Sequence, residues 1–236
     1  MVTRRRHKGF SLVELMVSLT IGLFLLVGLL TFLTNNLSSS RSSFENSRIS
    51  QELNAVMELM VRDIRRAGYS SSGATFTTSA TAAANPFTQS AVSGSTDGGI
   101  NIATLGCILY SYDMPGSANG SRDAAERLGF KLLNGVVYAA PAAGADSCGV
   151  NGWQPLTDPS ITEVTALTFE YLDASNAVAA TQKPIVAVSG SGWSLCTRNI
   201  KITLAGRLVK DSVATREVTQ SVRVRNDWYK GTGSSC

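Results

Sequence analysis

Few side chains of this 236-residue sequence could carry out covalent chemistry. Its single histidine, His7, lies in a short basic stretch at the N-terminus. Removal of that stretch by processing would leave no histidine, so Ser-His-Asp triads, Cys-His dyads and histidine-ligated metal sites would lack an essential group. We find no constellation of base, nucleophile and oxyanion donors in the sequence. The sequence therefore predicts a protein that is not an enzyme and that binds no cofactor, metal ion or small-molecule substrate.

Four cysteines form the other group of chemically capable residues, namely Cys107, Cys148, Cys196 and Cys236. All of them follow an apolar N-terminal segment, and their number is even. If that segment spans a membrane, they face an oxidising periplasm, where disulfides are expected. Three pairings are open, and we favour Cys107–Cys148 with Cys196–Cys236, because each bridge joins segments close in sequence and contributes roughly 3–4 kcal/mol. A metal site is disfavoured, since no C-x-x-C pair occurs and no histidine is at hand.

A carboxylate lies inside the most apolar part of the sequence. The run from Phe10 to Leu33 would span roughly 36 Å as a helix, enough to cross a hydrocarbon core of about 30 Å. It is longer than the apolar region of a secretory signal, and no A-x-A-like cleavage site follows it. Glu14 would cost roughly 2.5–3.5 kcal/mol at mid-membrane. Glu14 therefore either reaches the headgroups near the cytoplasmic end or pairs with a cation when chains assemble.

The excess of positive charge is concentrated at the N-terminus. Four of the 21 Lys and Arg residues fall within the first eight positions, and the remaining 17 equal the 17 Asp and Glu residues in number. The basic cluster is typical of the cytoplasmic flank of a membrane segment. The rest of the chain is formally neutral, which disfavours a nucleic-acid partner.

The N-terminal residues RRRHKGFSLVELMVSLTIGLFLL resemble the class III signal of type IV prepilins and pseudopilins. They share with it a short basic leader, a glycine, a phenylalanine, and an apolar helix with glutamate four residues after the phenylalanine. By this resemblance, prepilin peptidase would cut between Gly9 and Phe10 and methylate the new amine of Phe10. Glu14 would then recruit the subunit, or set its register, against a neighbour's amine. A single-span anchor with an incidental Glu14 is the alternative.

The helical pattern continues beyond the apolar run. It predicts one long helix from Phe10 to Gly68 with an apolar first half and an amphipathic second half. Its apolar stripe should pack on a globular head and consists of Leu37, Phe44, Leu53, Val56, Met57, Met60, Ile64 and Ala67. Arg65 and Arg66 could belong to a DNA-binding stripe, but a solvated helix end, where the helix dipole favours cations, is the better interpretation.

After residue 99 the periodicity changes to that of strands. We expect strands near 100–112, 130–139, 164–172, 184–188, 200–208 and 213–224, and a turn at SGSGWS, 189–194. Residues 70–99 are rich in Ser, Thr, Ala and Gly and should form a surface excursion outside the core. A helix followed by strands predicts an α+β fold with an antiparallel sheet packed against the helix. Its parts would be a leader (1–9), a transmembrane helix (10–33), an amphipathic continuation (34–68) and a periplasmic head (69–236).

Later segments resemble the PilW group of minor pilins: MELMVRDIRRAGY at 57–69, TDP at 157–159, ITEVTALTFEY at 161–171 and VRVRND at 222–227. The resemblance implies a type IV pilin-like fold and a minor pilin that helps to prime pilus assembly in a tip complex. Its partners would be prepilin peptidase, other minor pilins and the major pilin. The subunit would sit in the inner membrane before assembly and would then move into the pilus. Unlike the major pilins, the apolar helix contains Gly22 and Gly28 but no proline.

Two other functions share parts of this pattern. A minor pseudopilin of a type II secretion system has the same leader and helix, so the leader alone does not separate it from a pilin. An unprocessed membrane-anchored receptor, for instance for DNA, predicts an intact leader and a basic head. The neutral charge of the head disfavours that receptor.

Overall fold

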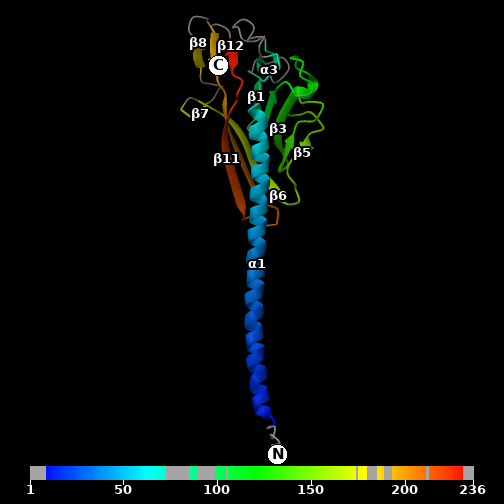
Figure 1. Cartoon of the computed structure of the whole chain (residues 1–236), viewed down its shortest axis with the longest axis vertical. Coiled ribbons are helices and arrows are strands. Elements are labelled where there is room, and N and C mark those ends of the chain that lie inside the picture. Colours follow the sequence, from blue (N-terminus) through cyan, green and yellow to red (C-terminus); the bar gives the residue numbers. More distant parts are fainter. Residues whose placement is uncertain are drawn as a thin grey trace, which may run out of the picture. The chain divides into compact units, whose positions relative to one another are not determined.

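The computed structural model of the chain (Figure 1) describes residues 9–72, 85–89, 99–104, 106–173, 175–179, 185–188, 193–210 and 213–230. The chain forms two compact units, Met1–Ser47 and Arg48–Cys236. One helix, α1 (Leu12–Ile64), belongs to both units, and the second unit contains antiparallel sheets. The predicted α+β architecture, with a long N-terminal helix ahead of antiparallel strands, is confirmed.

Helix α1 is shorter at both ends than the predicted helix from Phe10 to Gly68. It begins at Leu12 and ends at Ile64, and residues 65–68 form tight turns instead. Gly68 has a φ of 78°, in the left-handed region that a residue with a side chain enters only at a cost. The helix therefore stops just before a glycine that reverses the backbone.

The predicted apolar stripe is buried only in part. Leu37 and Phe44 are exposed, so the prediction is wrong for the first unit. The rest of the predicted stripe is buried, namely Leu53, Val56, Met57, Met60 and Ile64 on α1 and Ala67 in the turn that follows it. Ile49, which the prediction did not include, is buried as well. The reason is that only this part of the helix belongs to the unit with the sheets, whose strands supply an apolar surface for it.

The described part of the second unit contains three antiparallel sheets. The first runs in the order β1 (Ile100–Thr104), β2 (Cys107–Ser111), β3 (Arg127–Leu133), β4 (Val136–Ala139), β5 (Gln154–Pro155). The second runs β11 (Thr215–Arg223), β10 (Asn199–Leu208), β6 (Thr162–Leu172), β7 (Val178–Ala179). The third runs β12 (Trp228–Lys230), β9 (Trp193–Cys196), β8 (Ile185–Val188). Two short helical pieces, α3 (Pro86–Gln89) and the 3₁₀ turn η2 (Ala124–Glu126), interrupt the connections.

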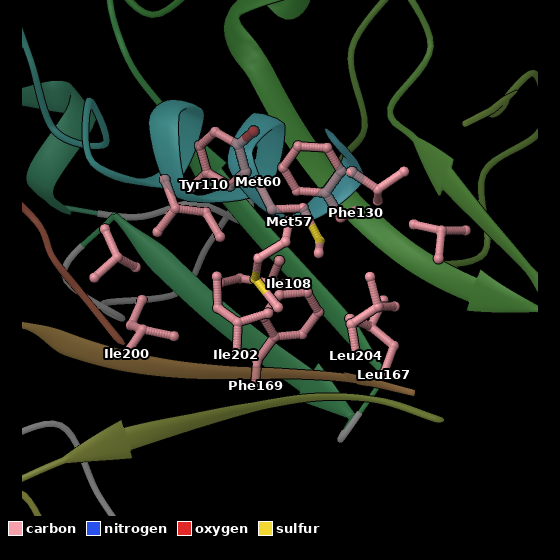
Figure 2. Packing of buried hydrophobic residues seen from close by; sticks show 14 of the residues in the cluster. Met57, Met60, Ile108, Tyr110, Phe130, Leu167, Phe169, Ile200, Ile202 and Leu204 are labelled. Atoms are coloured by element: carbon pink, nitrogen blue, oxygen red, sulfur yellow. The ribbon is translucent and has the colours of Figure 1, made fainter. Parts of the chain in front are cut away.

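The main core forms where α1 meets the first two sheets (Figure 2). Met57 and Met60 of α1 lie in one cluster with Ile108 of β2, Phe130 of β3 and Ile202 of β10. Strand β10 shows why the sequence folds this way, because every second residue is buried. Each buried side chain of this size stabilises the fold by roughly 1.5–3 kcal/mol, so the cluster holds the second half of α1 on the sheets.

Two segments that the sequence predicts as single strands each form part of a β-hairpin. The predicted strand 100–112 divides into β1 and β2, and the predicted strand 130–139 divides between β3 and β4. The second hairpin turns at Asn134 and Gly135, whose φ angles of 49° and 77° are both positive. Positive φ at both central residues is the geometry that makes Asn-Gly the preferred two-residue hairpin turn. The apolar residues on both sides conceal this signal when the segment is taken as one strand.

The other predicted elements agree with the structure to different degrees. The strands near 164–172 and 200–208 are confirmed as β6 and β10, and β8 and β11 lie within 184–188 and 213–224. The pattern does not reveal β5, β7, β9 or β12. Strand β9 takes up the last two residues of the predicted turn 189–194, and the rest of that turn lies outside the described residues. Phe87 is completely buried, so the prediction that 70–99 stays outside the core is wrong at α3.

A disulfide joins Cys107 to Cys148, with 6.4 Å between their Cα atoms. Cys107 is the first residue of β2, and the bridge borders a small second core that includes Leu109 and Trp153. This is the pairing that we favour for these two cysteines. Cys196 is buried in β9, but Cys236 lies outside the described residues, so the Cys196–Cys236 bridge stays a prediction.

A buried carboxylate organises the loop after β2. Asp113 is completely buried, and its Oδ2 accepts hydrogen bonds from the Ser71 hydroxyl (2.6 Å), the Ser71 N–H (2.9 Å) and the Gly120 N–H (3.0 Å). Burial alone would raise the pKa of Asp113, but these donors and the Asn119 N–H outweigh it and hold that pKa below its ordinary value. The carboxylate therefore ties two loops together in its charged form.

Replacing Asp113 by asparagine should lower the free energy of unfolding by about 2 kcal/mol at neutral pH, because the donors lose a charged acceptor. The folded-state pKa lies below the unfolded value of about 4. The stabilisation is therefore complete above that value and is lost as the pH falls through the folded-state pKa. Urea unfolding of the full chain in detergent, at neutral pH and near pH 2, should show a difference from wild type that shrinks in acid.

Glu217→Gln, which alters an exposed carboxylate of β11, is the matched control for this change. We expect it to unfold like the wild-type protein at both pH values. A difference for Asp113→Asn that stays constant with pH would contradict the assigned role of the charge.

Candidate processing and assembly site

The predicted cleavage site precedes the helix. Gly9 and Phe10 are not helical and are exposed, Phe10 by 82%. Helix α1 begins at Leu12, and the first hydrogen bond of its ladder runs from the Leu15 N–H to the Ser11 carbonyl at 3.1 Å. An exposed bond outside regular structure is the kind that proteases reach most easily. The structure thus leaves the Gly9–Phe10 bond accessible.

Glu14 lies in the first turn of α1, where the positive end of the helix dipole favours a negative charge. Its side chain is exposed, and no ion pair within the described residues compensates it. Three hydroxyls farther along the apolar run are satisfied by the helix itself. The hydroxyls of Ser18, Thr20 and Thr31 donate to carbonyls of the preceding turn at 2.6–2.8 Å. Glu14 is therefore the polar group of this run that most needs an external partner.

The first half of α1 presents an apolar surface all round. From Leu12 to Leu33 every side chain is exposed. The most apolar window of the helix has a mean hydropathy of 2.4, which makes α1 long and apolar enough to cross a membrane. An exposed surface of this kind requires cover by lipid or by other apolar helices.

The end of α1 is held by the C-terminal segment of the chain. The Asn226 side-chain amide donates to the carbonyls of Arg66 (3.2 Å) and Ala67 (3.1 Å), and the Arg225 N–H donates to the Arg65 carbonyl (3.1 Å). These bonds hold the turn that follows α1 against the segment after β11. They also bring together two of the segments, 57–69 and 222–227, that carry the resemblance to minor pilins.

A second contact joins α1 to the segments at 157–159 and 161–171. The Glu52 carboxylate accepts hydrogen bonds from the Asp158 N–H (2.8 Å) and from the Thr162 hydroxyl (2.6 Å). The sequence pattern does not single out Glu52, because it lies between buried positions of the helix and has the appearance of an ordinary surface charge. Only its distant partners show that it fixes the start of β6 against α1.

A Gly-Phe pair just before a helix that is apolar in its first part and then packs on antiparallel sheets defines a type IV pilin-like protein. The chain belongs to the family described as prepilin peptidase-dependent protein B, whose profile matches residues 42–224. The prokaryotic N-terminal methylation motif matches residues 4–30, and both families consist of structural, pilin-type proteins. A search of the curated proteins and a search of the solved structures gave no match. These findings do not test the PilW resemblance in particular, which stays a prediction.

Proposed function

We propose that this chain is a minor pilin of a type IV pilus, processed by prepilin peptidase and active in priming pilus assembly. The observation that carries the proposal is the sequence of features at the start of α1. An accessible Gly9–Phe10 bond is followed one turn later by Glu14, without an ion-pair partner among the described residues, on an apolar helix surface that is exposed throughout. Cleavage would create an amine that Glu14 of a neighbouring subunit could bind.

Before assembly, the apolar half of α1 would anchor the chain in the inner membrane as a single pass. The basic residues before it would stay in the cytoplasm, and the second unit would lie in the periplasm, where the Cys107–Cys148 disulfide is stable. After cleavage, the same apolar surface would pack against helices of the major pilin and of other minor pilins. Following the PilW resemblance, we place the subunit in a tip complex with those minor pilins.

Shearing surface filaments from cells and identifying the N-terminal peptide of this protein by mass spectrometry tests the proposal. We expect a peptide that begins with N-methylated Phe10 in the sheared fraction, in far fewer copies than the major pilin. A strain without prepilin peptidase is the control and should retain Met1–Gly9 in the membrane fraction.

Two results would point to other functions. A protein confined to the membrane with its leader intact would contradict processing and favour an anchored receptor. A cleaved protein that is absent from surface filaments but required for secretion would favour a type II secretion pseudopilin.

A further inference from the structure

A basic groove runs beside the last turns of α1, on the flank toward strand β11. Its helix side carries Leu59 and Arg62, which share a face because they are three residues apart, and Arg66 lies in the turn that follows the helix. On the other side lie Gln220 of β11 and Arg225, just after that strand. Gln220 pairs with Ile202 of β10, whose buried side chain belongs to the core cluster with α1, so both side chains point to the helix side of the sheet. The groove has a volume of about 730 Å³.

Two distant segments of the chain meet to bring arginines together in this groove. The Arg225 N–H donates to the Arg65 carbonyl at 3.1 Å, and the adjacent Asn226 side chain donates to the Arg66 carbonyl at 3.2 Å. As a result, Arg62, Arg65, Arg66 and Arg225 line one groove. Their positions follow from hydrogen bonds to the main chain and do not depend on flexible side chains alone.

Little of this positive charge is compensated within the described part of the chain. The Arg62 guanidinium is 3.9 Å from the Asp63 carboxylate, and its side chain is still 65% exposed. Arg65 and Arg225 take part in no ion pair between described residues. Glu58 contributes a carboxylate to the lining at the other end of the groove. The arginine end therefore keeps a net positive charge.

The dipole at the end of a helix explains only part of this cluster of arginines. Cations in the last turn of a helix and just after it are favoured by its dipole, which accounts for Arg62 on α1 and for Arg65 and Arg66 in the turn that follows. Arg225 is not on α1, and the chain after β11 brings it beside Arg65 against the repulsion between like charges. Such a cluster of guanidinium groups is suited to binding carboxylates or phosphates.

We propose that this groove binds an acidic peptide segment of a protein partner. From Ala55 to the end of α1 at Ile64 the groove follows roughly 14 Å of helix axis, the length of about four extended residues. Its ends differ, with arginines at one end and Ala55, Glu58 and Leu59 at the other. A peptide with carboxylates next to apolar residues matches both ends. A nucleic acid repeats its negative charge along its whole length, gains nothing from Leu59 and is repelled by Glu58.

Fluorescence anisotropy with three labelled probes tests the proposal on the full chain in detergent. The probes are a short peptide of alternating Glu and Val, the same peptide with Lys in place of Glu, and a short DNA duplex. We expect the acidic peptide to bind best, more weakly as ionic strength rises. The double variant Arg65→Glu with Arg225→Glu should weaken its binding by roughly tenfold or more and should improve binding of the Lys peptide.

Arg216→Glu is the matched control, since Arg216 is an exposed arginine of β11 outside the groove. It should bind the acidic peptide as the wild-type protein does, and circular dichroism should show that all variants are folded. Equal losses in the double variant and the control would overturn the proposal, because they would show unspecific attraction. Tighter binding of the DNA duplex, or no saturable binding of the acidic peptide, would overturn it as well.

Discussion

Changing Glu14 to alanine should leave cleavage after Gly9 largely intact and reduce incorporation of the protein into filaments by about tenfold or more. The Glu14 carboxylate has no ion-pair partner among the described residues, although the hydroxyls of Ser18, Thr20 and Thr31 are bonded to their own helix. Pairing with a neighbour's amine would stabilise that charge at one register of the two helices only. Alanine removes the charge and with it the preference for that register, but the helix remains able to span a membrane.

Quantitative mass spectrometry of sheared filaments and of membranes measures incorporation and cleavage of this variant together. Glu45→Ala is the matched control, because it removes an exposed carboxylate from α1 outside the apolar run. We expect the control to enter filaments as the wild-type protein does. Normal incorporation of the Glu14 variant would refute the register argument, and loss of its cleavage would show that Glu14 acts on the peptidase instead.

The elements that the sequence predicts well are those whose periodicity is set by burial on one side. Strand β10 alternates buried and partly exposed residues over its whole length, and the second half of α1 buries a stripe with helical spacing. In both cases only one side of the element faces the core, and burial on that side determines which positions are apolar. The prediction is wrong at Leu37 and Phe44 because a helical stripe in the sequence does not show whether a surface exists to cover it.

The predictions that are wrong in the first sheet have a different physical cause. The sequence around Asn134 and Gly135 is apolar on both sides, so its hydrophobicity is that of one continuous strand. The turn depends instead on the ability of these two residues to adopt positive φ. The position of this turn is therefore set by the backbone preferences of two residues and not by hydrophobicity.

The arginine groove could not be derived from the sequence, because its residues are joined by topology. Arg65 and Arg66 have the appearance of a solvated helix end, and Arg225 that of an ordinary residue after a strand. The hydrogen bonds that Arg225 and Asn226 donate to the carbonyls of residues 65–67 place the two segments side by side. The cleavage motif differs in this respect, since Gly9, Phe10 and Glu14 are close in sequence and need no fold to be recognised.

Replacing Cys107 and Cys148 together by serine should lower the free energy of unfolding by about 4 kcal/mol, since the bridge closes a loop between cysteines 41 positions apart. That is a large share of the roughly 5–15 kcal/mol that stabilises a typical folded protein. The bridge also holds a contact in place. The Lys131 ammonium donates to the Cys148 carbonyl at 2.9 Å and lies 4.5 Å from the centre of the Trp153 ring.

Urea unfolding of the full chain in detergent, followed by tryptophan fluorescence, measures this loss. Lys131→Met is the control that separates the bridge from the contact it holds. It keeps the disulfide but removes the hydrogen bond and the cation–π interaction, so it should cost only about 1–2 kcal/mol. If the loop constraint dominates, the double serine variant should be clearly the less stable of the two. Equal unfolding midpoints for these variants would mean that the lysine contact, and not the covalent bridge, holds the segment before Trp153 against the first sheet.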